Sequence, residues 1–273
     1  MTASPTDFPV DRYGEHGLAF PIAVLSPDEV ARFRASVEEL QDALGGKPPA
    51  VEQGQTHLSF AWAYELSTHP AILDATEKIL GPNLVVWSTS VFVKYARDPG
   101  YVSWHQDGTY WGLDSGKVAT AWGALSESTV ENGCMRVAPG THTEPIHPHK
   151  DTYAENNQLT RGQEVAVDVN EDDAVDIVLK PGEMSLHHVN IIHGSNANGT
   201  DGKRIGYVIR YITTDVKQSA TDQAVILARG VDEYGHSKLL ETRPTANVQE
   251  GLAAHKEVTR EMVTALRKTK GAY

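Results

Sequence analysis

The sequence predicts a mainly β fold, an antiparallel sandwich or barrel flanked by α-helices. Before residue 80, apolar residues recur at helical spacing. After residue 80, short β-branched and aromatic runs alternate with turn residues, which is typical of antiparallel strands. The chain of 273 residues has no evident linker, and a single all-β unit often reaches roughly 250 residues. We therefore expect one domain over residues 1–273.

Helices are expected at three places. Residues 26–29, Ser-Pro-Asp-Glu, combine a capping serine, a proline at the first helical position and a glutamate three residues after the cap. Apolar residues then follow at helical spacing from Val30 to Leu44. A second helix is expected over 69–80, because the following Gly-Pro pair ends helical geometry. Residues 248–270 predict a closing amphipathic helix that packs on the barrel or on a partner.

Strands are expected from residue 84 onward, beginning with a long run over 84–95. Further runs cover 118–125, 164–169, 177–179, 184–188 and 205–212. The acidic triplet 171–173 between two of them is interpreted as a solvated turn. The expected organisation is N-terminal helices over about 1–82, a barrel over about 83–215, and a C-terminal segment and helix over about 216–273.

Charge and composition exclude several functions. The net charge is −12, and a nucleic-acid binder needs a basic face that this sequence lacks. No stretch reaches the roughly 18–20 apolar residues of a membrane-spanning helix, and the first ten residues lack a signal pattern. The single cysteine, Cys134, cannot form an internal disulfide, which fits a reducing compartment. We expect a cytoplasmic protein with no nucleic-acid or membrane partner; the oligomeric state is open.

A candidate metal site begins at residues 103–111, Ser-Trp-His-Gln-Asp-Gly-Thr-Tyr-Trp. In an extended chain, residues two apart face the same side, so His105 and Asp107 can converge on one point. A distant His193 is followed eleven residues later by Arg204. Two histidines and one carboxylate on one face of a metal are the ligand set of non-heme iron(II) oxygenases. A guanidinium binds a carboxylate bidentately, which suits the distal end of 2-oxoglutarate.

The chain resembles the phytanoyl-CoA dioxygenase family of iron(II)- and 2-oxoglutarate-dependent oxygenases. The motifs that carry this resemblance are Tyr13 to Gly17, Trp104 to Asp107, Thr120 to Trp122, Glu131 to His142, Lys180 to Glu183, His193 to Ser195, and Arg204. Residues 110–112 and 229–236 look similar to the bacterial branch of the family. The resemblance implies a double-stranded β-helix, a jelly-roll, cupin-like barrel that holds the metal inside one mouth.

The resemblance also implies a set of functional positions. These are the iron ligands His105, Asp107 and His193, the cosubstrate-binding Arg204, and the pocket positions Gln106, Trp122 and Thr120. The implied cofactors are Fe(II), 2-oxoglutarate and O2. The implied activity is hydroxylation of an unactivated C–H bond in a small polar metabolite or natural-product intermediate, with release of succinate and CO2. An amino acid, a phosphonate or a carrier-bound intermediate is the expected kind of substrate.

The candidate substrate contacts are Arg210, Trp104, Tyr110 and Lys94. Arg210 has the same parity as Arg204 in one predicted strand, so a regular strand points both into the barrel. Our hypothesis is that Arg204 holds 2-oxoglutarate, while Arg210, nearer the metal or the substrate, orders the outer shell or an acidic group of the substrate. Trp104, Tyr110 and Trp111 either form an aromatic wall over the substrate or fill a core.

Several histidines and the cysteine have simpler interpretations. His187 and His188 are adjacent, so one of them could replace His193 as a ligand; otherwise both are expected to be barrel residues with satisfied hydrogen bonds. The histidines at 142, 147 and 149 are expected in a surface loop. Cys134 is expected to be a buried structural thiol rather than a nucleophile.

Other functions stay open at the level of sequence. The same family includes desaturases, cyclases and halogenases, but halogenating relatives have a small residue where this chain has Asp107. A cupin-type enzyme would use the metal without 2-oxoglutarate, and it has no need of Arg204. The remaining alternative is a non-catalytic barrel that binds a small ligand and retains a vestigial triad.

Overall fold

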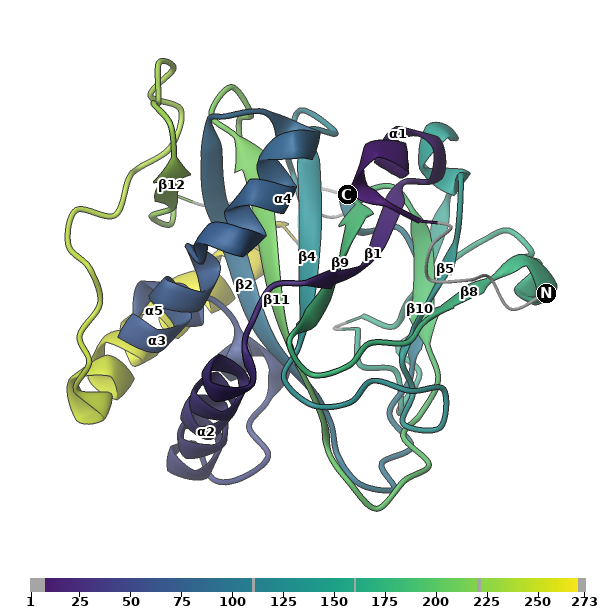
Figure 1. Ribbon diagram of the computed structural model, residues 1–273, viewed down its shortest axis with the longest axis horizontal. Helices are drawn as coiled ribbons and strands as arrows, with labels where there is room; N and C mark the ends of the chain where they lie inside the picture. Colours follow the sequence, from purple (N-terminus) through teal and green to yellow (C-terminus); the bar gives the residue numbers. More distant parts are fainter. Residues whose placement is uncertain (1–7, 110, 160, 220–221, 270–273) are drawn as a thin grey trace.

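Two antiparallel sheets face each other as a double-stranded β-helix in the computed structural model, which describes residues 8–109, 111–159, 161–219 and 222–269 (Figure 1). The larger sheet consists, in spatial order, of β1 (Leu18–Ala23), β9 (Glu183–His188), β4 (Val118–Ala124), β11 (Arg204–Thr213), β2 (Leu84–Lys94) and β12 (Ile226–Arg229). The smaller sheet consists of β3 (Val102–His105), β10 (Ile192–Ser195), β5 (Met135–Ala138) and β8 (Val175–Ile177). A separate ribbon pairs β6 (His149–Asp151) with β7 (Gln163–Val165). The predicted fold class is confirmed.

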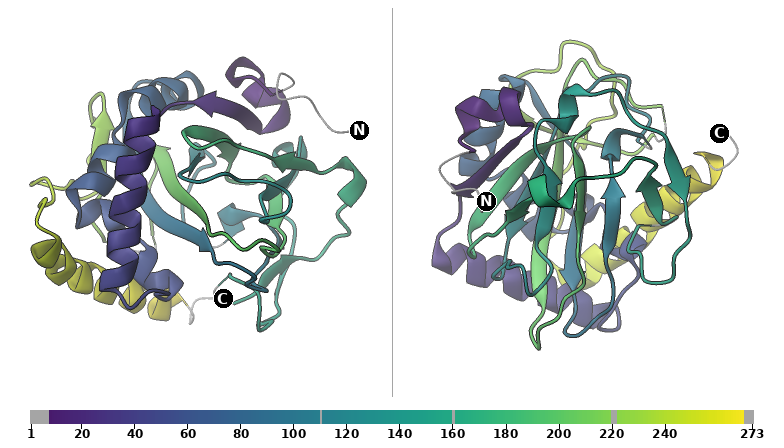
Figure 2. Two further views of the ribbon diagram at one scale, coloured as in Figure 1. Left: turned by 60° about the horizontal axis from the view of Figure 1, so that its bottom comes forward. Right: turned by 90° about the vertical axis from the view of Figure 1, so that its right-hand side faces the viewer.

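The helices gather on the face of the larger sheet that is turned away from the smaller sheet (Figures 1 and 2). They are α2 (Pro27–Ala43), α3 (Ala61–Ser67), α4 (Pro70–Leu80) and α5 (Val248–Thr269). The single-turn α1 (Tyr13–His16) instead precedes β1 and accepts a hydrogen bond from the Gly140 amide, in the segment after β5 (Figure 1). Helix α2 begins as the sequence predicts. The Ser26 hydroxyl accepts a hydrogen bond from the Glu29 amide, and the Glu29 carboxylate accepts one from the Ser26 amide at 2.8 Å. These capping bonds lower the pKa of Glu29 to about 2.

Strand β11 separates the helix-facing core from the interior of the barrel. Its odd-numbered residues Ile205, Tyr207, Ile209 and Tyr211 are buried in the cluster that includes Phe33 of α2. Its even-numbered residues Arg204, Val208 and Arg210 line a cavity between the two sheets. This alternation follows from the two-residue repeat of a strand. One strand therefore both holds the helices and presents the candidate functional side chains.

The N-terminal strand β1 was not predicted, because Pro21 interrupts its apolar run. Proline is tolerated there since β1 is an edge strand, where a missing amide donor breaks no ladder bond between central strands. Two strands are placed differently from the prediction: β7 ends at Val165, and β8 ends at Ile177. The acidic residues 171–173 form an exposed 3₁₀ turn, as expected.

The closing helix α5 packs mainly on the two 3₁₀ turns Ala50–Gln53 and Thr56–Leu58 rather than on barrel strands. Its buried His255 contacts the Ser59 hydroxyl at 3.3 Å and the Glu52 carbonyl at 2.7 Å. Leu252 of α5 also packs against the apolar cluster between the larger sheet and the helices, and packing of this helix on a partner stays a prediction. The side chain of Leu266 lies outside the described residues. Within the described part of the chain, no helix is long and apolar enough to cross a membrane.

The capping box predicts the effect of one substitution on stability. Ser26→Ala removes an acceptor from the Glu29 amide and should lower the free energy of unfolding by about 1 kcal/mol. Urea unfolding followed by circular dichroism measures this change. Ser36→Ala, within the same helix, is the matched control and should change stability little, since alanine has the better helix propensity. Equal effects of the two substitutions would contradict the assigned capping role.

Candidate metal centre

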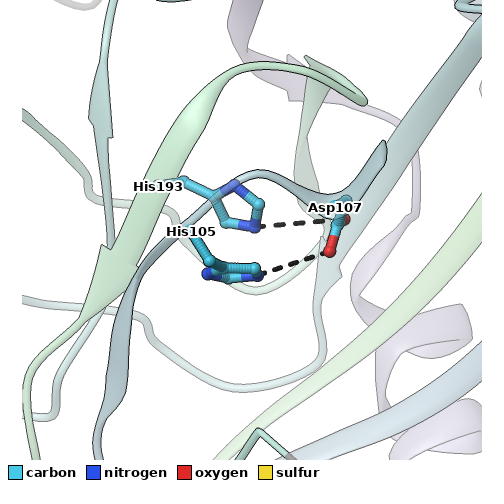
Figure 3. A group of neighbouring side chains, drawn as sticks. All are labelled: His105, Asp107 and His193. Atoms are coloured by element: carbon cyan, nitrogen blue, oxygen red, sulfur yellow. Dashed lines mark ion pairs between the residues drawn. The ribbon is translucent and has the colours of Figure 1, made fainter. Parts of the chain in front are cut away.

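Three side chains converge where the smaller sheet ends. His105 is the last residue of β3, Asp107 begins the 3₁₀ turn that follows, and His193 lies on β10, whose register places it opposite His105. The Nε2 atom of His105 lies 3.3 Å from one carboxylate oxygen of Asp107, and that of His193 lies 4.0 Å from the other (Figure 3). The potential ligand atoms of these three residues lie within 4.8 Å of one another. The predicted triad is thus brought together around a single point.

Both imidazoles are oriented by backbone carbonyls. The Nδ1 atom of His105 lies 2.9 Å from the Ser103 carbonyl, and that of His193 lies 3.0 Å from the Ile191 carbonyl. A carbonyl only accepts hydrogen bonds, so each Nδ1 carries the proton. Each Nε2 lone pair is then directed at the carboxylate of Asp107, the arrangement in which histidine binds a metal.

The charges at this point also suit a cation. Burial, followed by the nearby His105, lowers the pKa of His193 to about 4. Burial acts to raise the pKa of Asp107, but the neighbouring basic groups His105, His193 and Arg210 hold that pKa well below its usual range. At neutral pH the carboxylate is therefore ionised and His193 is neutral. These are the protonation states that a divalent metal requires of its ligands.

The triad opens into a cavity of about 100 Å³ between the two sheets. Besides the triad, the residues that line it are Phe92, Val102, Thr120, Trp122, Met135, Leu159, His187, Gly194, Ser195, Arg204, Val208 and Arg210. A wider groove beside Tyr13 and Lys78 lies outside the barrel, and the triad does not line it.

Arg204 is a buried cation without an acidic partner among the described residues. Its guanidinium donates to the Gly133 carbonyl and lies over the rings of Trp122 at 5.1 Å and Phe92 at 5.8 Å. The Nε atom has no hydrogen-bond partner in the described part of the chain, and burial lowers the pKa of Arg204 to about 10. A buried charge without a counterion is costly, so this position fits an anionic ligand group.

Two expected site residues, Gln106 and Trp104, are placed elsewhere by the alternation of strands. Gln106 stands between His105 and Asp107 in the chain, and its side chain points away from the cavity. Its amide nitrogen donates to the Asn190 carbonyl, and its amide oxygen accepts from the His147 amide. Trp104 lies under the guanidinium of Arg136 at 5.5 Å and does not line the cavity. The expectations that Gln106 lines the cosubstrate pocket and that Trp104 contacts substrate are therefore corrected. Gln106 instead ties two loops to the end of β3.

Lys94 does not line the cavity either. It lies beside Arg204, as its register partner on β2, and donates to the Asn196 carbonyl. Burial, together with the charge of Arg204, lowers the pKa of Lys94 to about 7. The structure therefore gives no support to Lys94 as a substrate contact. Tyr110 lies outside the described residues, whereas Thr120 and Trp122 line the cavity as expected.

The adjacent histidines have different surroundings. His188 accepts a hydrogen bond from the Asn190 amide, as expected for a structural residue, and points out of the barrel. His187 points into the cavity, and its ring centre lies 5.1 Å from that of His193. Its Nδ1 atom has no partner among the described residues, so the expectation of a satisfied hydrogen bond is wrong for His187. His193, not His187 or His188, completes the triad.

The remaining residues follow the simpler interpretations. Cys134 is buried and free, and burial raises the pKa of its thiol to about 12, which makes it a poor nucleophile. Trp111 contacts Trp87 with ring centres 5.2 Å apart, and Arg210 lies over it at 5.0 Å. Trp111 therefore packs against Arg210, which lines the cavity, and against Trp87. His142 and His147 lie in the partly exposed segment between β5 and β6. The loop expectation is wrong for His149, which begins β6 and accepts a hydrogen bond from the Gln106 amide.

The residues present fit iron and 2-oxoglutarate. The donor set is two neutral imidazoles and one carboxylate, and a buried cation with an unpartnered Nε atom lies in the same cavity. His105, Asp107 and His193 would hold the iron from one side. Arg204 would take the distal carboxylate of the cosubstrate, and the rings of Trp122 and Phe92 would flank it.

Comparison with known proteins decides the family. Residues 13–206 match the family model of phytanoyl-CoA dioxygenase. The chain belongs to the phytanoyl-CoA dioxygenase family. It is thereby an enzyme of the Fe(II)- and 2-oxoglutarate-dependent dioxygenase class, and the matched range contains all three triad residues and Arg204.

The proteins that this chain resembles are described as acting on different substrates. The rat peroxisomal phytanoyl-CoA dioxygenase is 27% identical over 235 residues, which cover 75% of this chain and 68% of the relative. A probable alpha-ketoglutarate-dependent hypophosphite dioxygenase of Stutzerimonas stutzeri is 26% identical over 58% of this chain and 56% of its own length. The chain spans about half of the human and nematode phytanoyl-CoA dioxygenases. Among solved structures, the non-heme monooxygenase ThoJ is similar over 97% of this chain and 99% of its own, with 33% identity and a TM-score of 0.82.

The packing of Trp122 predicts how one added methyl group affects the cosubstrate site. A Cβ atom at position 206 would lie 2.2 Å from the Trp122 ring, so Gly206→Ala should force that ring to move against the Arg204 guanidinium. We expect affinity for 2-oxoglutarate to fall about tenfold or more. Anaerobic equilibrium titration with Fe(II) present measures this affinity. Gly202→Ala is the matched control, since a Cβ there meets nothing within 4 Å; equal affinities of the two variants would contradict the packing argument.

Proposed function

We propose that this chain hydroxylates an unactivated C–H bond of a small polar metabolite or natural-product intermediate and releases succinate and CO2. The observation that carries the proposal is the placement of a complete two-histidine, one-carboxylate set and an unpaired Arg204 in the same cavity. When bound, iron(II) and 2-oxoglutarate would supply the oxidising chemistry by coupling oxygen activation to decarboxylation. The protein would supply binding, orientation and the exclusion of side reactions.

Each cavity residue has a definite task in this proposal. The backbone carbonyls of Ser103 and Ile191 hold the two imidazoles so that their Nε2 atoms face the metal. Arg204 orients the cosubstrate through its distal carboxylate. Apolar side chains on both sheets exclude water from the space beside the metal; these include Val102, Met135 and Val208. Orientation and exclusion of this kind decide which C–H bond reacts.

Hydroxylation is favoured over halogenation because Asp107 occupies the position of the third ligand. Its carboxylate lies within reach of both imidazoles, so the three protein ligands are all present. A small residue at this position would free a coordination site for a halide. The intact triad and the unpaired Arg204 also disfavour a metal-independent ligand-binding barrel.

The cosubstrate role of Arg204 gives a direct test. Wild-type protein titrated anaerobically with Fe(II) and 2-oxoglutarate should develop the weak visible charge-transfer band of the chelate. In Arg204→Met the affinity for 2-oxoglutarate should fall about 100-fold, because hydrogen bonds to a charged partner are worth roughly 1.5–3 kcal/mol each. Bound iron, measured by elemental analysis, should stay the same in this variant.

Two further variants control this experiment. Asp107→Ala should lose iron as well as the band, whereas Arg136→Gln, on the outer side of the smaller sheet, should keep both. After oxygen is admitted, succinate formation should rise with one member of a panel of amino acids, phosphonates and acyl carriers. No band from iron-loaded wild-type protein would refute the proposed function.

A further inference from the structure

A row of three polar side chains crosses the inner face of the larger sheet. Thr120 on β4 is the register partner of His187 on β9 and also of Arg210 on β11. All three side chains line the metal cavity. They come from positions far apart in sequence, and only the pairing of the three strands brings them into one line. We call these three residues the polar row.

Each member of the polar row has a buried polar atom without a hydrogen-bond partner among the described residues. These atoms are Nδ1 of His187, Oγ1 of Thr120 and Nε of Arg210. Buried polar groups are nearly always satisfied, so an unsatisfied group requires an explanation. Here three of them belong to neighbouring residues that face one cavity. A hydroxyl, a guanidinium N–H and an imidazole N–H can all donate to the same acceptor group.

The Arg210 guanidinium is held in place. One terminal nitrogen donates to the Ser90 hydroxyl at 3.1 Å, and the group lies over the ring of Trp111 at 5.0 Å. These contacts leave the edge that contains Nε for another partner. Two parallel N–H groups on such an edge match the two oxygens of a carboxylate.

The charges of the cavity leave Arg210 without a permanent counterion. The charged residues that line it, among those described, are Asp107, Arg204 and Arg210, which together carry one net positive charge. Asp107 would be committed to the metal, and the charges of iron(II) and dianionic 2-oxoglutarate cancel. Arg204 is six residues from Arg210, roughly 20 Å along an extended strand, so each arginine meets a different group. One positive charge therefore stays unmatched beside the metal.

We propose that the polar row binds a carboxylate of the substrate, with Arg210 as its counterion and Thr120 and His187 as further donors. This inference rests on the proposed function and narrows the substrate to small molecules that carry a carboxylate near the carbon that reacts. It assigns Arg210 to substrate specificity rather than to the cosubstrate. A neutral isostere of the carboxylate would leave the guanidinium buried and unpaired, which the site should reject strongly.

The test compares acetate with its neutral isostere acetamide. Protein loaded with Fe(II) and saturating 2-oxoglutarate is titrated anaerobically at constant ionic strength, and tryptophan fluorescence is followed, because Trp111 contacts Arg210. We expect acetate to bind at least tenfold more tightly than acetamide. Arg210→Met should abolish this preference, and Thr120→Val should reduce it about threefold. Arg136→Gln, the matched surface arginine, should keep it.

The outcomes separate this inference from the proposed function. A charge-transfer band with equal binding of acetate and acetamide, or a preference that persists in Arg210→Met, would overturn the polar row as a carboxylate site while the oxygenase function stands. Absence of the band would overturn the function instead. The fluorescence titration needs no turnover, so it tests the inference separately from catalysis. If Arg210→Met does not fold, Arg210→Lys replaces it and should retain charge but lose most of the preference, because it lacks the two parallel donors.

Discussion

Burial of positive charge inside the barrel is the constraint on which the rest of the site depends. Arg204 and Lys94 are register partners on β11 and β2, and both are almost completely buried. Their hydrogen bonds go to the carbonyls of Gly133 and Asn196, not to a carboxylate. Burial lowers the pKa of both groups, to about 10 for the arginine and about 7 for the lysine. Removing a charge from water costs several kcal/mol per ion, so this arrangement requires stabilisation from elsewhere and an anion within the cavity.

The stabilisation comes from the opposite face of the same strands. Between the charged positions of β11, Ile205, Tyr207 and Ile209 are buried against the helices. Burial of a large apolar side chain contributes roughly 1.5–3 kcal/mol. Helices α2, α3 and α4 complete this core, which explains why they cover the outside of the larger sheet. The helices thus stabilise the larger sheet, whose inner face presents the polar side chains, and none of their described residues lines the metal cavity.

Much of this arrangement can be predicted from sequence because it depends on local rules. The capping box fixed the start of α2, and the two-residue repeat placed Arg204 and Arg210 on one face of a strand. The same repeat, applied consistently, would have turned Gln106 away from the cavity, since it stands between His105 and Asp107. The family resemblance alone implies a pocket position for Gln106, and it does not specify the direction of the side chain.

The residues that sequence did not predict depend on register between distant strands. Nothing local tells whether His187 or His188 faces inward, because adjacent residues simply exchange faces when a strand shifts by one position. The pairing of β9 with β4 settles this by placing His187 opposite Thr120. Lys94 is a similar case, since its parity is compatible with the cavity but its place beside Arg204 follows from the β2–β11 register.

The same register divides the cavity into two ends with different electrostatics. The charge of Arg210 helps to lower the pKa of Asp107. Arg204 instead interacts with Lys94 and Cys134, away from the triad. The metal ligands and the polar row therefore form one electrostatic unit, and the Arg204 end forms another. The distal carboxylate of a dicarboxylate bound at the Arg204 end neutralises the charge of Arg204 and makes no ion pair with Arg210. Because the two ends are held by the same rigid strand, an anion at one cannot substitute for an anion at the other.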